Sequence, residues 1–230
     1  MIIKGLQKLT LLDYPEHTAC TVFTGGCNLR CPFCHNASLA LNPASVDEID
    51  EEKFFSFLRK RKGILDGVCI TGGEPLINTD IENFMLRIKQ LGFKVKIDTN
   101  GTLPVRLKSV VENGLADYVA VDIKNSKKLY EITVGVSYFN TSPVEKTVDY
   151  LMSGNIPYEF RTTVTRTFHT ENSMRELSEW IKGAKRYFLQ NFVNSGDLIN
   201  PQIEGYSLEE MQKMLDIVKP NIPSAQIRGI

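Results

Sequence analysis

Three cysteines within one short loop are the residues best suited to chemistry. Cys27, Cys31 and Cys34 lie between Gly25 and Asn36, with three and then two residues between them. Three thiolates at these spacings can surround one compact inorganic core, and thiolates are ligands that suit zinc or an iron–sulfur cluster. A structural zinc site usually takes its fourth ligand from a second cysteine pair, which this sequence lacks. On these residues alone, a zinc site and a three-thiolate cluster with an open iron both remain possible.

The composition limits where the protein works and what it binds. The chain has 230 residues, a formal net charge of zero and five cysteines, an odd number that does not fit a secreted disulfide framework. Neither an apolar stretch of about 18 residues nor a signal-peptide core is visible, so we expect a cytoplasmic protein without a membrane segment. The balanced charge argues against nucleic acid as the main partner. Cys20 and Cys69 lie in apolar runs, where we expect them to be inert and buried.

Strand and helix patterns alternate along the chain. The expected strands are 17–24, 67–71, 94–98, 118–123, 158–164 and 186–193, and the expected helices are about 50–61, 81–92, 104–113, 171–181 and 207–218, with another beginning at Ser142. This order is typical of parallel strands joined by crossover helices. Six such units form either a partial barrel or a flatter doubly wound sheet. No linker or repeat interrupts them, so we expect a single domain over 1–230, ending in a helix and tail over about 207–230.

Polar residues gather where the expected strands end. Gly72 to Glu74, Asp98 to Asn100, and Asp122 with Lys124 follow successive strands, and Arg161 lies within the fifth. Ligands of parallel α/β folds bind at the carboxyl ends of the strands. We therefore expect the active site at that edge, beside the cysteine loop.

Two motifs together resemble those of the radical S-adenosylmethionine (SAM) superfamily. The first is C-x3-C-x-aromatic-C over Cys27 to Cys34, with Phe33 as the aromatic residue, and the second is Thr71 to Pro75 at the end of the next strand. Two shorter sequence motifs, Cys34 to Asn36 and Leu12 to Pro15, resemble motifs of the activases of glycyl radical enzymes. They are most similar to those of the activating proteins of anaerobic ribonucleoside-triphosphate reductase.

The resemblance implies a fold, cofactors and a set of site residues. We expect an α/β fold, a partial (β/α)6 TIM-like barrel, with a 4Fe–4S cluster on Cys27, Cys31 and Cys34. The fourth iron would take the amine and carboxylate of SAM, and a monovalent cation would neutralise that carboxylate. The side chains and backbone expected to bind SAM or the cation are Phe33, Asn36, Gly72, Gly73, Glu74, Asp98, Thr99, Asp122, Lys124, Arg161 and His169.

The resemblance also implies a reaction. A flavodoxin or ferredoxin would reduce the cluster, SAM would be cleaved to methionine and a 5′-deoxyadenosyl radical, and that radical would abstract hydrogen from a glycine of a partner enzyme. Anaerobic ribonucleotide reductase is the partner that we predict. The alternatives are an activase of the pyruvate formate-lyase type, a small-molecule radical SAM enzyme similar to 7-carboxy-7-deazaguanine synthase, and a zinc-stabilised binding module without catalysis.

Overall fold

The computed structural model describes residues 1–229, which form two compact units interleaved in the sequence. The first unit contains Met1–Asn28, Ser38–Thr99 and Leu103–Val119. The second contains Leu29–Ala37, Asn100–Thr102 and Ala120–Ile230, of which Ile230, the last residue of the predicted tail, lies outside the described residues. The cysteine loop is thereby shared between the units.

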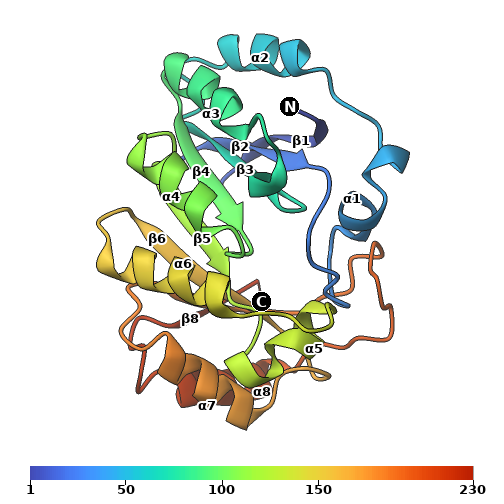
Figure 1. The fold of residues 1–230 in the computed structure, drawn as a ribbon, viewed down its shortest axis with the longest axis vertical. Helices are drawn as coiled ribbons and strands as arrows, with labels where there is room; N and C mark the ends of the chain where they lie inside the picture. The colour runs from blue at the N-terminus through green and yellow to red at the C-terminus, as the bar shows by residue number, and fades with distance from the viewer. Residues whose placement is uncertain (230) are drawn as a thin grey trace. The chain divides into compact units, whose positions relative to one another are not determined.

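The first unit contains four neighbouring strands (Figure 1). They are β1 (Ile3–Thr10), β2 (Ala19–Thr24), β3 (Gly67–Gly72) and β4 (Lys94–Thr99). β2, β3 and β4 pair in parallel, as the alternating pattern predicts, whereas β1 pairs with β2 in the antiparallel direction. β1 is not among the expected strands. Only its two end residues are buried, so it lacks the alternation of buried and exposed residues that indicates a strand.

Aromatic rings join two of the helices that lie wholly or mostly in the first unit. The elements are α1 (Ala37–Leu41), η1 (Pro43–Ser45), α2 (Glu51–Arg59), η2 (Pro75–Ile77), α3 (Ile81–Gln90) and α4 (Pro104–Glu112). α2 begins where the side chain of Asp50 accepts a hydrogen bond from the backbone N–H of Lys53. Phe54 and Phe55 of α2 stack on or abut Phe84 of α3, with ring centroids 5.3 and 5.4 Å apart.

The second unit repeats the strand-then-helix order. β5 (Tyr118–Asp122) runs from the first unit into the second, which also holds β6 (Tyr158–Val164), β7 (Tyr187–Asn191) and β8 (Gln226–Arg228). β6, β7 and β8 pair in parallel. The helical elements are η3 (Lys127–Leu129), α5 (Tyr130–Val134), α6 (Ser142–Ser153), α7 (Glu171–Trp180) and α8 (Leu208–Val218). α8 begins with the predicted capping box, in which Ser207 and Glu210 exchange side-chain-to-backbone hydrogen bonds.

The expected fold class is confirmed. All six expected strands are present, and the chain has an α/β fold with a mostly parallel sheet. β1 and β8 are additional. β8 is three residues long and lies within the stretch that we expected to be a tail. Across residues 1–229, none of the helices has both the length and the apolar character that crossing a membrane requires.

Candidate functional site

The three cysteines of the loop are divided between the two units. Cys27 belongs to the first unit, and Cys31 and Cys34 belong to the second, where the Cys34 N–H donates to the Cys31 carbonyl at 3.0 Å. Burial raises the pKa of the Cys34 thiol. Within the described part of the chain, no three His, Cys, Asp or Glu side chains form a group that could hold a metal ion. The assignment of all three cysteines to one cluster therefore stays a prediction.

The second-unit part of the loop is fixed by the segment that follows β7. His35 Nε2 lies 2.8 Å from the carbonyl oxygen of Val193, and the imidazole stacks on the Phe192 ring at 5.1 Å. The Asn200 N–H donates to the Pro32 carbonyl at 2.9 Å. Burial lowers the pKa of His35, which favours the neutral ring. These contacts fix the side chain of His35 next to Cys34.

Two glycines at the end of β3 bring that strand against the backbone before Cys27. Gly72 has a φ of +114°, and a side chain there would overlap the backbone of Thr24. A side chain on Gly73 would overlap the carbonyl oxygen of Gly26. The Glu74 N–H donates to that same carbonyl at 2.8 Å. We predicted that these glycines allow close approach to SAM, and the structure shows that they already allow two backbones to meet.

Glu74 is a buried carboxylate held by the neighbouring strand end. Its Oε1 accepts from the Leu76 N–H at 3.1 Å and from the Thr99 hydroxyl at 2.8 Å. Two of the predicted site residues, Glu74 and Thr99, are therefore in direct contact. At the end of β2, the hydroxyl of Thr24 is buried without a hydrogen-bond partner among residues 1–229. An unpaired buried hydroxyl is costly, and a bound ligand is one way to satisfy it.

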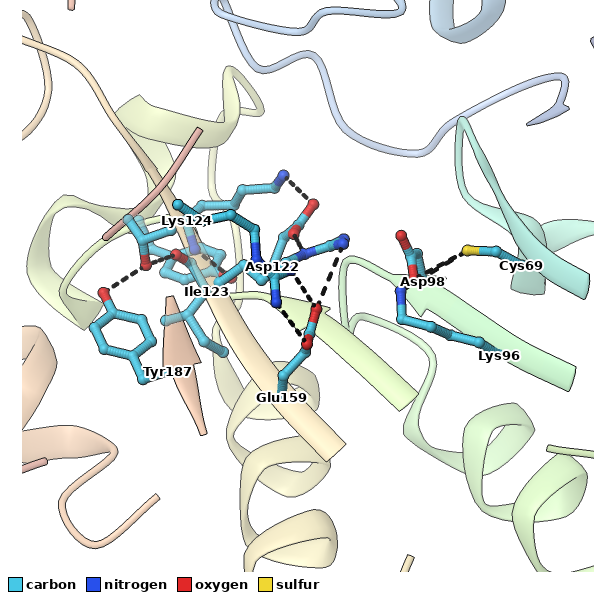
Figure 2. A network of polar contacts seen from close by, with 12 residues as sticks. Cys69, Lys96, Asp98, Asp122, Ile123, Lys124, Glu159 and Tyr187 are labelled. Atoms are coloured by element: carbon cyan, nitrogen blue, oxygen red, sulfur yellow. Dashed lines mark hydrogen bonds and ion pairs between the residues drawn. The ribbon is translucent and has the colours of Figure 1, made fainter. Parts of the chain in front are cut away.

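Asp98 lies in a buried polar cluster that no sequence motif indicated (Figure 2). Lys96 pairs with Asp98 two residues further along β4, and its side chain is 0% exposed. The Cys69 thiol lies 3.7 Å from Asp98 Oδ1 and 3.8 Å from Lys96 Nζ. Cys69 is buried, as expected. Its thiol, however, contacts the charged side chains of Asp98 and Lys96. The signal for Lys96 was its spacing, because residues i and i+2 of a strand share a face.

In the second unit, Asp122 is held between two cations (Figure 2). Lys124 Nζ donates to Asp122 Oδ2 and Arg161 Nε donates to Oδ1, both at 3.0 Å. Burial alone would raise the pKa of Asp122, but Arg161 and Lys124 outweigh it and hold that pKa well below its usual range. Burial likewise opposes the charge on Lys124, and Asp122 raises the Lys124 pKa. These three predicted site residues form one charged cluster.

His169 supports the backbone of Lys124. Its Nδ1 accepts from the Thr165 N–H at 3.1 Å, so Nε2 carries the proton and donates to the Lys124 carbonyl at 2.8 Å. Burial lowers the pKa of His169 to about 4. Phe33 is buried beside this imidazole, with ring centroids 6.2 Å apart. Asn36 is half-buried at the end of the cysteine loop, and its contact with SAM stays a prediction.

The donor types fit an iron–sulfur cluster with bound SAM. Thiolates are suitable ligands for such a cluster. The turn after β3 accommodates only glycine at positions 72 and 73, and the buried hydroxyl of Thr24 is available to hydrogen-bond a ligand. Two of the predicted acidic contacts are paired with cations: Asp98 with Lys96, and Asp122 with Lys124 and Arg161.

Comparison with known proteins gives the family. The model of the radical SAM superfamily matches residues 21–183, more than half of the chain. The protein belongs to this superfamily and is a radical SAM enzyme. Membership implies a 4Fe–4S cluster and SAM as cofactors.

Two relatives differ in how much of the chain they share. A protein of Methanocaldococcus jannaschii, "Putative glycyl-radical enzyme activating enzyme", is 30% identical over 100% of this chain and 96% of its own length. A 7-carboxy-7-deazaguanine synthase of Halobacterium salinarum is 37% identical, but over 39% of this chain and 35% of its own length.

Solved structures agree on the fold. SuiB of Streptococcus suis, bound to its precursor peptide SuiA, matches with a TM-score of 0.69 at 20% identity. The match covers 91% of this chain and 48% of SuiB, so this chain spans about half the length of SuiB. At this identity the likeness concerns the fold, which is the TIM-barrel-like fold of radical SAM enzymes.

Proposed function

We propose that this radical SAM enzyme is an activase that generates a glycyl radical on a partner protein. The observation that carries the proposal is the similarity to the M. jannaschii protein over the whole chain and 96% of that protein. The sequence motifs Cys34 to Asn36 and Asp122 to Lys124, which resemble motifs of activases, also support the proposal. The similarity to the 7-carboxy-7-deazaguanine synthase covers 39% of this chain, so a small-molecule substrate is the less favoured alternative.

In this proposal Cys27, Cys31 and Cys34 hold the cluster. When bound, the cluster and SAM supply a low-potential electron and a 5′-deoxyadenosyl radical that takes hydrogen from a glycine. The protein positions and shields these groups. Glu74, fixed by Thr99, accepts from the amine of SAM, and Phe33 packs near its adenine.

Charged groups at the other strand ends receive the polar parts of SAM. Asp98 would bind the ribose, and Lys124, whose ammonium donates to Asp122, would bind the carboxylate of SAM. A monovalent cation at that carboxylate is part of the proposal, although Asp98 and Asp122 each have a protein cation as a partner. His169 makes both of its ring hydrogen bonds to protein backbone, so it would contact SAM through ring carbons.

The partner that we propose is anaerobic ribonucleoside-triphosphate reductase, in the cytoplasm, with flavodoxin or ferredoxin as the electron donor. The resemblance of Leu12 to Pro15 and Cys34 to Asn36 supports this choice. SuiB was solved with a peptide bound, which supports a protein substrate for this fold. An activase of the pyruvate formate-lyase type is the alternative.

Anaerobic reconstitution with iron and sulfide tests the proposal. The chain is reduced with dithionite, SAM is added, and 5′-deoxyadenosine is measured; separate mixtures then contain an anaerobic ribonucleotide reductase or a pyruvate formate-lyase, read by electron paramagnetic resonance for a glycyl radical. We expect 5′-deoxyadenosine and a radical in the reductase. The Cys31→Ala variant should lose iron and product, whereas Cys20→Ala, a buried thiol of β2, should keep both.

Each other outcome has a separate meaning. A radical only in the lyase would reassign the partner, and 5′-deoxyadenosine with neither radical would favour a small-molecule substrate. A chain that binds zinc, assembles no cluster and yields no 5′-deoxyadenosine would refute the proposal.

A further inference from the structure

Cys69 and Lys96 lie side by side in the interior of the first unit. They are paired residues of the neighbouring parallel strands β3 and β4, so their side chains leave the sheet on the same face. Both side chains are 0% exposed, and Lys96 Nζ lies 3.8 Å from Cys69 Sγ. The strand register therefore holds a thiol and an amine in contact with each other, away from bulk water.

Asp98 completes the group (Figure 2). Its carboxylate pairs with the ammonium of Lys96, and its Oδ1 lies 3.7 Å from Cys69 Sγ. Lys96 and Asp98 are two residues apart on β4 and share a face of the sheet. The Asp98 side chain is 11% exposed, so a proton taken up by this carboxylate can pass on to solvent.

These surroundings differ from those of an inert structural cysteine. Reactive cysteines lie beside cationic side chains, whereas cysteines enclosed by apolar side chains are inert. Oxidation of a reactive thiol gives a sulfenic acid, whose sulfur condenses with a neighbouring thiol or nitrogen. For Cys69 a contacting nitrogen is the amine of Lys96. Dioxygen is a small apolar molecule, so it can reach a buried thiol that larger reagents cannot.

We propose that Cys69 and Lys96 form an oxygen-dependent covalent crosslink, in which one oxygen atom bridges the thiol sulfur and the lysine nitrogen. Dioxygen is the oxidant. The S–H bond and two N–H bonds of the ammonium break, an S–O and an O–N bond form, and sulfur and nitrogen lose two electrons each. Dioxygen takes up these four electrons, because one of its atoms becomes the bridge and the other leaves as water. One proton remains, and Asp98 accepts it.

The crosslink changes the first unit in two ways. It joins β3 to β4 covalently, and it removes the cation from Asp98, because the bridged nitrogen is no longer an ammonium. A dithiol reverses the reaction: two dithiol molecules supply four electrons, the thiol and the amine are restored, and the bridging oxygen leaves as water. This inference goes beyond the proposed function and does not rest on it, since the reaction needs neither the cluster nor SAM.

Peptide mapping of the full-length chain tests the crosslink. The chain is purified anaerobically, and one portion is then exposed to air. Both portions are denatured, alkylated with iodoacetamide and digested with trypsin. Trypsin releases Cys69 in the peptide 63–87. It does not cut at a modified lysine, so a crosslinked Lys96 is released in the peptide 95–106.

We expect these two peptides to be joined in the portion exposed to air. Their combined mass should be increased by one oxygen atom and reduced by two hydrogen atoms. With isotopically heavy dioxygen, the added oxygen should be the heavy isotope. The anaerobic portion should contain no joined peptides, and treatment with dithiothreitol before digestion should remove them from the other portion.

Two variants and one internal control accompany the wild type. Lys96→Arg keeps a cation beside Asp98 but removes the primary amine, and Cys69→Ser removes the thiol, so neither variant should yield joined peptides. Cys20 is also 0% exposed, but it lies on β2 and its paired residue on β3 is Val68. It should therefore form no link to a lysine. The main readout comes from the wild type and does not depend on how the variants fold.

Three results would overturn the proposal. Cys69 that is mainly alkylated after exposure to air would show that its thiol does not react. Cys69 oxidised to a sulfinic acid, with normal cleavage at Lys96, would show oxidation without capture by the amine. Joined peptides that lack the additional oxygen, or that carry the light isotope after heavy dioxygen, would show a different linkage or a different oxidant.

Discussion

Removing the ammonium of Lys96 should destabilise the first unit strongly. Lys96→Met leaves the carboxylate of Asp98, whose side chain is 11% exposed, without its lysine partner. Breaking a buried ion pair by removing one partner costs about 3–5 kcal/mol. The Cys69 thiol remains at 3.7 Å as a weak donor, so we expect the lower end, about 3 kcal/mol. For a chain of this size that corresponds to about 6–12 °C in Tm.

The assay is urea unfolding followed by far-ultraviolet circular dichroism. Trp180 lies in the second unit, so its fluorescence would not report the first unit directly. Lys94→Met is the matched control, because Lys94 occupies the same strand and its ammonium lies 3.2 Å from His17 in an exposed contact. The Lys96→Met/Asp98→Asn variant, which buries no charge, should recover most of the loss.

Two results would refute this reasoning. Equal losses in Lys96→Met and Lys94→Met would mean that the buried pair contributes nothing particular. A double variant as unstable as Lys96→Met would mean that Lys96 acts by packing rather than by pairing with Asp98.

Two further predictions concern a glycine and a histidine. Gly73→Ala should lower the free energy of unfolding by about 3 kcal/mol, because the added methyl group would overlap the backbone of Gly26. Gly92 has a φ of +92° and open space around it, so Gly92→Ala should lower the free energy of unfolding by about 1 kcal/mol from backbone strain alone. Thermal denaturation compares the two variants, and equal losses would contradict the predicted overlap. His169 has a folded-state pKa of about 4 against an ordinary value of 6.5, so the unfolded chain takes up a proton first, and stability should fall by up to about 3 kcal/mol as the pH drops from 6.5 to 4. Urea unfolding at both pH values measures this loss, and a His169→Asn variant with the same pH dependence would contradict it.

The strands and the identity of the site motifs could be predicted from the sequence, because they depend on local signals. Apolar runs ending in polar residues indicated β2 to β7, and the spacing of the cysteines indicated the loop. β8 was missed because three residues carry too little pattern, and β1 because most of it is partly exposed.

Which charged side chains form ion pairs with one another could not be predicted from such local signals. Arg161 pairs with Asp122, which lies 39 positions earlier in the sequence on another strand. Arg228 and Glu159 are 69 residues apart in the sequence, and only strand register across β6, β7 and β8 brings them together. Lys96 was overlooked because lysine in an alternating strand usually marks the solvent side.

The anchoring of the cysteine loop has a consequence for biosynthesis. His35 and Val193 are separated by 158 positions, and Pro32 is held by Asn200. During translation from the N-terminus, Cys31 and Cys34 therefore leave the ribosome long before the residues that fix their loop. We expect their turn to reach its final conformation only after residues 193–200 have been synthesised, so that a cluster held by this loop would assemble after that point.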